Sequence, residues 1–291
     1  TKNFAAWTAL AGTLDSRIRV TGGLRVDAFT RTGDVAVQPR GEVAIKLQPK
    51  LTAKVSAGAY SRPPEHQTEL LDDTLKAERS TQLIGGLVYE PTDGIRLQGS
   101  GYYTDRSRLI TRDSMTGALG NHGRGTTVGG ELLATLKTGP WFAWLAYSYS
   151  HSTRIDTPGT ERRLFDFDQP HNLNVAVSYR MKRWQIGARF RAHSGLPSTP
   201  VETSIFDSDA NVYFPAFGEV NSTRAPLHHQ LDLRIDRSFR WGPVKMTKFL
   251  DVQNVYLNDT VVGYFYNFDY TQRAAFRSLP ILPTAGLRGE F

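Results

Sequence analysis

The feature that most constrains this chain is a strict alternation of apolar and polar residues, repeated in segments of about ten residues. In the segment from Leu231 to Phe239, the odd positions are mostly apolar and the even positions are charged or small and polar. Successive side chains of a β-strand point to opposite faces, so such a segment has one apolar face and one polar face. No stretch shows a convincing 3.6-residue periodicity. The pattern therefore predicts an all-β chain.

The alternating segments predict about thirteen antiparallel strands. They lie near residues 3–14, 18–30, 40–48, 51–61, 80–90, 94–106, 126–138, 141–152, 171–181, 184–194, 229–240, 244–257 and 281–291. Short connections alternate with long ones: the short ones are 15–17, 49–50, 91–93, 139–140, 181–183 and 241–243, and the long ones are 31–39, 62–79, 107–125, 153–170, 195–228 and 258–280. Short turns on one rim and long loops on the other are typical of a transmembrane β-barrel. A soluble sandwich or propeller has no reason to segregate loop length so regularly.

The composition excludes several other classes of protein. The chain has no cysteine, which excludes disulfide scaffolds and cysteine-ligated metal sites. Its longest apolar run, Trp141 to Tyr147, is far too short for a spanning helix. The 35 Lys and Arg residues are interleaved with 28 acids, so the net charge of +7 forms no basic stripe and no nucleic-acid partner is expected. We find no catalytic constellation, and we expect neither an enzyme nor a cofactor.

Aromatic residues on the apolar positions lie near both ends of the predicted strands. Those beside short turns are Tyr89, Trp141, Tyr179 and Trp184, and those near the opposite ends are Tyr103, Tyr149, Phe190 and Tyr256. Two such rings are typical of the two interfaces of a membrane barrel, although the same residues would also suit the core of a soluble sheet. The polar positions are rich in Arg, Lys, Asp and Glu, which predicts a wide, wet or plugged lumen and a barrel of many strands.

Several stretches, taken in order, resemble the C-terminal half of the barrel of TonB-dependent outer-membrane receptors. They are Gly23–Asp27, Pro39–Arg40, Phe165–Leu173, Ser194–Pro197, Asp251–Tyr256 and Leu282–Phe291. The resemblance spans essentially the whole chain, so residues 1–291 are expected to form one C-terminal barrel portion. Such receptors have 22 strands, an N-terminal plug in the lumen and a short motif that engages TonB. Neither the plug nor the motif is found in this sequence.

The resemblance implies a further part of the barrel. A complete bacterial barrel has an even number of strands, and a 22-stranded one needs on the order of 490 residues. We therefore expect the missing N-terminal barrel half and the plug to lie in the same protein or in a partner chain, with TonB engaged only through that part. The other expected partner is outer-membrane lipid. The chain is expected in the bacterial outer membrane, with its C-terminus periplasmic and its long loops extracellular.

The resemblance implies the wall and surface loops of a receptor that takes up a scarce ligand. The alternative is a split or plugless barrel that serves as a scaffold or conduit in an envelope secretion or motility complex. A passive pore is a third hypothesis.

The long loops contain the candidate site residues. Exposed aromatics could stack on a ligand or pack against a neighbouring loop, and charged side chains could join them. The ligand-binding candidates are Tyr213, Phe214, Phe217, Arg154 and Arg162. Together with Arg163, Asp166 and Asp168, the two arginines are expected to form a solvated loop network. No metal site is expected, although Asp207, Asp209 and Asn211 have the alternate oxygen ligands of a calcium loop without its glycine and its final acid.

Overall fold

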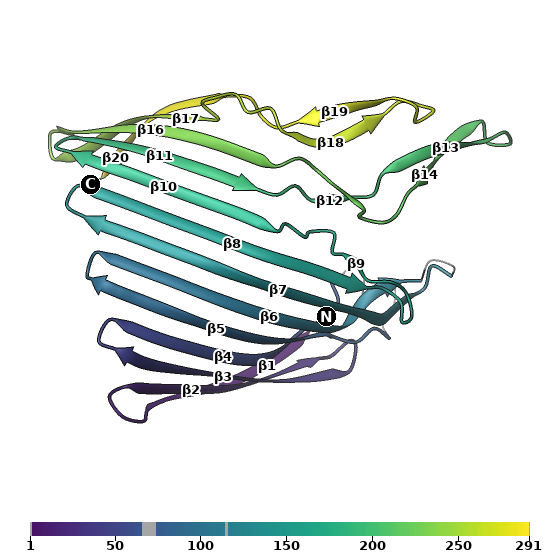
Figure 1. Cartoon of the computed structure of the whole chain (residues 1–291), viewed down its shortest axis with the longest axis horizontal. Coiled ribbons are helices and arrows are strands. Elements are labelled where there is room, and N and C mark those ends of the chain that lie inside the picture. The colour runs from purple at the N-terminus through teal and green to yellow at the C-terminus, as the bar shows by residue number, and fades with distance from the viewer. Residues whose placement is uncertain (1, 66–73, 114–115, 291) are drawn as a thin grey trace. The chain divides into compact units, whose positions relative to one another are not determined.

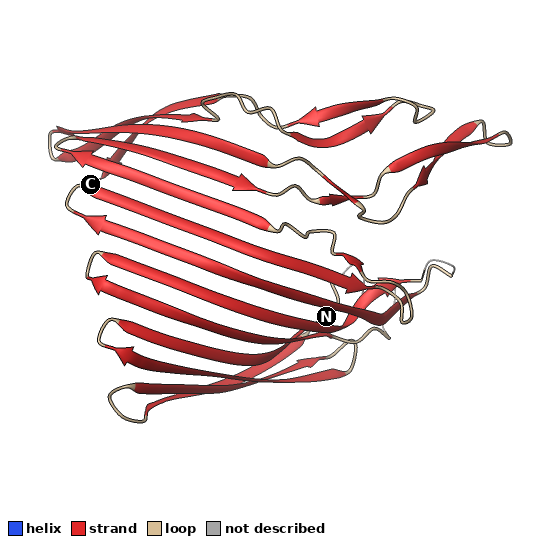
Figure 2. Ribbon diagram, viewed as in Figure 1, coloured by secondary structure: helices blue, strands red, loops and turns tan. Residues whose placement is uncertain are grey.

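The computed structural model describes residues 2–65, 74–113 and 116–290, in which strands alternate with turns and loops (Figure 1, Figure 2). The main sheet has 14 strands, of which thirteen follow one hydrogen-bonded path in the order β1-β2-β3-β4-β5-β6-β7-β8-β10-β11-β16-β17-β20, while β9 (Arg163–Leu164) pairs with β8. In the described ranges, no helix has the length and hydropathy needed to cross a membrane.

The strands of this path confirm each of the thirteen predicted segments. They are β1 (Asn3–Thr13), β2 (Ile18–Phe29), β3 (Asp34–Gln48), β4 (Leu51–Arg62), β5 (Glu78–Thr92), β6 (Ile95–Arg112), β7 (Leu119–Thr138), β8 (Trp141–Ile155), β10 (His171–Met181), β11 (Trp184–His193), β16 (His228–Trp241), β17 (Val244–Gln253) and β20 (Leu282–Glu290). Every register resolved along the path is antiparallel; for example, Leu233 lies opposite Val252. The all-β expectation is therefore confirmed for the described residues.

The short turns occur where they are expected, and their backbone explains why they are tight. Gly139 and Gly242 have φ angles of 54° and 59° at the β7–β8 and β16–β17 turns, and Lys182 has 50° at the β10–β11 turn. Two-residue hairpin turns require positive φ, because it matches the right-handed twist of the paired strands. Glycine adopts this conformation without steric cost.

Four strand ends differ most from the sequence prediction. β6 continues to Arg112 and β7 starts at Leu119, so most of the expected loop 107–125 is strand. β3 starts at Asp34, so most of the expected loop 31–39 is strand. β17 ends at Gln253 instead of continuing to residue 257, because Asn254 and Leu257 have φ angles of 54° and 55°. The Asn254 amide side chain donates to the backbone oxygens of Asn258 and Leu279, which holds the chain in this bend.

Three of the long connections contain strands that the sequence did not predict; in the connection after β8 this is the short strand β9. In the connection after β11, β12 (Pro197–Ser198) pairs with β15 (Thr223–Arg224), and β13 (Val201–Asp207) forms a hairpin with β14 (Val212–Phe217). In the connection after β17, β18 (Val261–Tyr266) pairs with β19 (Arg273–Arg277). Both hairpins are labelled in Figure 1.

The chain divides into two compact units, which we describe separately. The first unit consists of residues 1–90, 98–131 and 150–165, and the second of residues 91–97, 132–149 and 166–291. A small buried cluster of Phe29, Ala36 and Ala77 lies in the first unit.

In both units the strands have an apolar face, whose side chains are largely exposed. In the first unit Val43 and Val55 lie opposite each other on this face, and in the second Ile235 and Leu250 do so. Val55 is 55% exposed and Leu250 is 45% exposed. A sheet with one apolar face left open is incomplete as a water-soluble structure, because an extended apolar surface needs a covering layer or lipid.

Candidate functional site

The polar face of the second unit is built around a buried carboxylate, Asp232, on β16. Asp232 is 5% exposed, and Arg189 and Arg191 of β11 pair with its Oδ2 atom at 2.8 and 3.2 Å. The Oδ1 atom accepts hydrogen bonds from Gln230 Nε2 at 2.6 Å and from the backbone N–H of Asn254 at 3.1 Å. Strand alternation and cross-strand register bring these donors to one face, so the carboxylate loses water but keeps a full set of partners.

A second charged group continues this face along β16 and β17. Arg234 pairs with Asp236 at 2.9 Å and with Asp251 at 3.3 Å, and its guanidinium lies 4.2 Å from the centroid of the Phe249 ring. The predicted charged side is thus present as ion pairs, one within β16 and one from β16 to β17.

Asp168 corrects the expectation of a solvated loop network. Its carboxylate is fully buried and pairs with Arg224 of β15 at 2.7 Å. The same guanidinium donates to the backbone oxygen of Gly195 at 2.9 Å, and Asp166 accepts a hydrogen bond from Asn221 Nδ2 at 2.7 Å. The stretches around Asp168 and Gly195 therefore meet at the base of the long connection after β11, where they fix the two strands that carry the β13–β14 hairpin.

The aromatic candidates lie on that hairpin. The Tyr213 ring contacts Phe206 of β13 at a centroid distance of 4.9 Å and Phe268 at 5.5 Å. Phe214 and Phe217 remain 53% and 64% exposed. The structure thus uses Tyr213 for packing and leaves the other two aromatics exposed.

A polar contact strengthens the link between the β13–β14 hairpin and the β18–β19 segment. The Ser204 hydroxyl donates to the backbone oxygen of Asp269 at 2.7 Å. The Thr271 hydroxyl and backbone N–H both donate to the Asp269 carboxylate, and these hydrogen bonds lower the pKa of Asp269. The turn that carries Phe268 is therefore ordered by its own hydrogen bonds and by the neighbouring hairpin.

The calcium candidates form the turn between β13 and β14. Asp207 Oδ1 accepts hydrogen bonds from the backbone N–H groups of Asp209 and Ala210 at 2.9 and 3.1 Å, and Asn211 has a φ of 52°. One carboxylate oxygen thus closes an Asx-type turn. Among the described residues there is no group of three or more His, Asp or Glu side chains that could hold a metal ion. Calcium binding at Asp207, Asp209 and Asn211 stays a prediction.

The arginine candidates belong to the first unit and are engaged with their neighbours. Arg154 Nε lies 2.7 Å from the Asp156 carboxylate, which also pairs with Arg163 at 2.5 Å. Arg162 donates to the hydroxyls of Thr126 at 2.5 Å and Thr153 at 2.9 Å. These two arginines and the three aromatics lie in different units, so each group is a candidate by itself.

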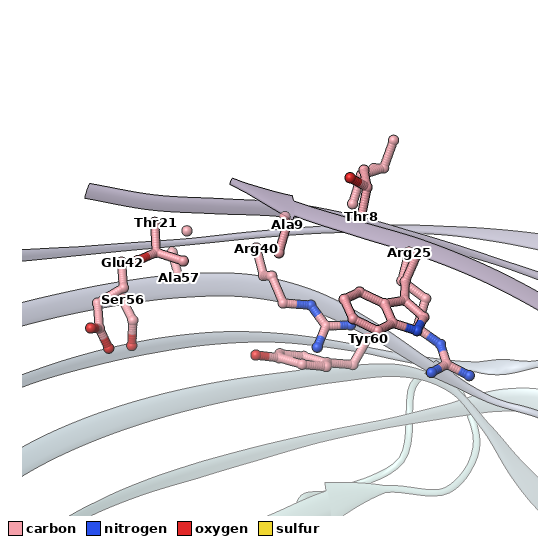
Figure 3. A pocket seen from close by; sticks show the side chains of 13 residues that line it. Thr8, Ala9, Thr21, Arg25, Arg40, Glu42, Ser56, Ala57 and Tyr60 are labelled. Carbon is pink, nitrogen blue, oxygen red and sulfur yellow. The ribbon is translucent and has the colours of Figure 1, made fainter. Parts of the chain in front are cut away.

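A pocket on the polar face of the first unit was missed by sequence reasoning. It has a volume of about 600 Å³ and is lined by residues of β1 to β4 (Figure 3). The Arg40 guanidinium lies 5.4 Å from the centroid of the Tyr60 ring, and Trp7 lies opposite Arg25 in the register of β1 and β2. Figure 3 shows Glu42, Thr21 and Ser56 grouped apart from Arg40 and Tyr60. The pocket therefore combines a cationic, aromatic end with an acidic, hydroxyl-bearing end.

Two neighbouring features shape this pocket. Arg25 makes a bidentate pair with Asp27, with hydrogen bonds of 2.8 and 2.7 Å, and Gln38 also donates to Asp27. Gly58 lies beneath Tyr60: a Cβ atom there would come within 2.8 Å of the Tyr60 hydroxyl. The absence of a side chain at Gly58 is what lets the ring lie flat on the sheet. The signal in the sequence was the polar-face position of Arg40 and Tyr60, but their contact depends on the register.

Comparisons with known proteins agree with this geometry. The family model described as "TonB dependent receptor-like, beta-barrel" matches residues 1–268. No curated protein matches the chain.

Solved structures share the fold at low sequence identity. The FrpB iron transporter from Neisseria meningitidis is 18% identical, has a TM-score of 0.73, and is matched over 98% of this chain and 44% of that chain. The ferric-catecholate import receptor Fiu from K12 E. coli is 13% identical, with a TM-score of 0.72 over 99% and 45% of the two chains. The copper transporter OprC is 19% identical, with a TM-score of 0.63 over 94% and 46%.

The chain thus spans less than half the length of each of these structures. Because the family model covers nearly all of the sequence, the match does not depend on a single motif. The two-faced antiparallel strands, the short turns and the charged polar face all belong to one chain, and that chain is a member of the TonB-dependent receptor β-barrel family of the Gram-negative outer membrane.

Proposed function

We propose that this chain supplies the wall and surface loops of an outer-membrane receptor that takes up a scarce ligand. The observation that carries the proposal is the pair of contacting hairpins, β13–β14 and β18–β19, which expose Phe214, Phe217 and Phe268 while Tyr213 and Ser204 hold them together. Exposed aromatics on ordered segments offer a binding surface at low entropic cost.

In this proposal the polar faces of the two units line the lumen of the barrel. In the second unit the ion pairs around Asp232 and Arg234 supply a fixed wall. In the first unit the pocket beside Arg40 and Tyr60 is a site where a ligand can bind transiently during uptake. In this proposal the long loops face the exterior and the C-terminus faces the periplasm.

The solved structures support a proposal for the ligand class. They are described as an iron transporter, a ferric-catecholate import receptor and a copper transporter. We propose a metal ion or metal complex as the cargo, with energy supplied through TonB by a part of the receptor outside this chain.

An uptake measurement tests the function. Cells that express the gene encoding this chain, and matched cells that lack it, are given radiolabelled ferric citrate, a ferric catecholate complex or copper(II). Uptake of one of these above the deletion strain, abolished by a protonophore, supports energised transport. If uptake of all three compounds is equal in both strains, the proposed cargo class is wrong. If the chain raises uptake and the protonophore does not reduce it, the chain acts as a passive pore.

The role of the hairpin aromatics has its own test. With the complex that gives uptake, the Phe214→Ala/Phe217→Ala variant is expected to weaken ligand binding by roughly tenfold or more, because each removed ring is worth about 1 kcal/mol of contact. The matched control is Leu227→Ala/Leu279→Ala, which removes two exposed apolar side chains outside the β13–β14 hairpin. Equal losses in the two variants would show that the hairpin aromatics have no special part in binding.

A further inference from the structure

Two cations lie opposite each other on the apolar face of the second unit. Arg237 of β16 is the register partner of Lys248 of β17, and both side chains are exposed. The row continues on either side through Trp184 of β11 and Leu287 of β20. This row belongs to the same face as Ile235 and Leu250, which are also register partners.

Among the residues that the structure describes, no carboxylate neutralises this pair. Neither Arg237 nor Lys248 forms an ion pair with any residue that the structure describes, and the Arg237 guanidinium lies 5.1 Å from the centroid of the Trp184 ring. Like charges directly opposite each other on two strands destabilise the pairing. On the polar face of the same hairpin the situation differs, because Lys245 pairs with Glu290 at 2.9 Å and Arg234 pairs with two aspartates.

The position of Arg237 and Lys248 along their strands matches the headgroup region of a bilayer. Arg237 precedes the end of β16 at Trp241 by four residues, which is roughly 13 Å along a strand and less when the strand is tilted. At the same rim, the Trp141 and Tyr179 rings contact each other at 4.6 Å. Tryptophan and tyrosine mark the level of lipid headgroups, and long basic side chains reach toward that level from the hydrocarbon.

We propose that Arg237 and Lys248 bind the phosphate group of an anionic phospholipid. The guanidinium and the ammonium supply the positive charge that a phosphate needs, and the exposed side chains of Ile235 and Leu250 continue from them as a surface for the acyl chains. The combination of paired cations with an adjoining apolar strip selects a lipid over a free phosphate ion. The inference requires lipid contact by the apolar face, and it is independent of which ligand the receptor takes up.

A lipid-binding measurement on the full chain tests the proposal. The protein is folded in mixed micelles that hold equal amounts of phosphatidylglycerol and phosphatidylcholine, and the lipids retained are counted by native mass spectrometry. The wild-type chain is expected to retain phosphatidylglycerol in roughly tenfold preference, because each basic residue near a membrane surface adds to the attraction for anionic lipid. The Arg237→Gln/Lys248→Gln variant is expected to lose this preference.

The control variant is Arg240→Gln/Lys245→Gln. These residues are also register partners in the β16–β17 hairpin, but they lie on the polar face, so the variant removes the same charge from the other side of the sheet. It is expected to keep the preference, as is the charge-conserving Arg237→Lys/Lys248→Arg variant. Heat-dependent gel migration verifies that each variant is folded. Equal loss in the control, or an unchanged preference in Arg237→Gln/Lys248→Gln, would overturn the proposal.

Competition with inorganic phosphate shows whether the two cations bind a phospholipid or a free phosphate ion. Millimolar inorganic phosphate is added to the wild-type chain with bound phosphatidylglycerol. If the lipid is retained, the acyl chains contribute to binding as proposed. If phosphate alone displaces it completely, the pair is a site for a free anion and the lipid assignment is wrong.

Discussion

The polar faces of the two units are built from the same alternation of residues, but Asp232 in the second unit and Arg40 in the first have opposite surroundings. In the second unit, Asp232 is buried by two arginines, a glutamine and a backbone N–H group, although a pocket of about 650 Å³ opens farther along this face, beside Arg234 and Asp236. In the first unit, Arg40 lies against Tyr60, forms no ion pair with a described residue, and borders a pocket of about 600 Å³. Paired charges thus form a closed wall around Asp232, whereas Arg40 lies open at the edge of its pocket.

The strongest test of this comparison is the removal of the central acid of the wall. Asp232→Ala leaves Arg189 and Arg191 without their carboxylate, and we expect the free energy of unfolding to fall by about 2–3 kcal/mol, because hydrogen bonds to a charged group are lost while the two arginines stay partly exposed to water. Urea unfolding of the chain in micelles measures this change. The exposed pair of Asp259 and Arg277 provides the control: Asp259→Ala is expected to cost less than about 0.5 kcal/mol. A small effect at Asp232 would mean that water replaces the lost acid, and the wall would then resemble the pocket.

A second test asks whether buried pairing also fixes the loops. Asp168→Ala removes the acid that holds Arg224, and we expect a local destabilisation of about 2 kcal/mol in the connection after β11. Proteolysis between residues 195 and 228 is expected to become faster, with little change in the unfolding of the sheet. A loop that remains equally resistant to protease would show that β12 and β15 hold without the ion pair.

The third test is directed at the pocket. Gly58→Ala forces the Tyr60 ring off the sheet, and we expect a loss of about 1–2 kcal/mol, the usual cost of added volume at a tight contact. Gly85→Ala on the neighbouring strand is the control, because a Cβ atom there meets nothing within 4 Å. The free energy of unfolding is measured for both variants. Equal losses would indicate that replacing a glycine in a strand, and not the contact with Tyr60, causes the destabilisation.

The smallest effect on stability is expected at Arg40. Since Arg40 has no ionic partner among the described residues, Arg40→Ala removes only its contact with Tyr60, worth about 0.5–1 kcal/mol at an exposed site. Arg40→Lys keeps the charge and serves as the matched variant. If Arg40→Ala destabilised the chain as much as Asp232→Ala does, the division into wall and pocket would be wrong.

Most of the main sheet could be predicted because its signal is local. Alternation at Leu231 to Phe239 identifies a strand without any knowledge of its neighbours, and all thirteen predicted segments are confirmed. The β13–β14 and β18–β19 hairpins were missed because their strands are short and their alternation is weak, so they depend on contacts such as Tyr213 with Phe268. Asp168 was expected to be solvated because the segment around it has the polar composition of an exposed loop. Its burial is explained by its partner Arg224, which lies 56 residues away in the sequence.

The sequence by itself determined which residues share a face, because the two-residue period of a strand is a property of the backbone. It therefore gave the apolar side, the polar side, the short turns and the resemblance to the receptor family. The tertiary structure decided which residues of neighbouring strands stand opposite one another. That register places Arg237 beside Lys248, Arg189 beside Asp232, and Trp7 beside Arg25, and it depends on the length of each turn and the pairing of whole strands. Whether a charge is paired, stacked on a ring or left without an ionic partner follows from the register, because electrostatic contacts act over a few ångströms between chain segments far apart in sequence.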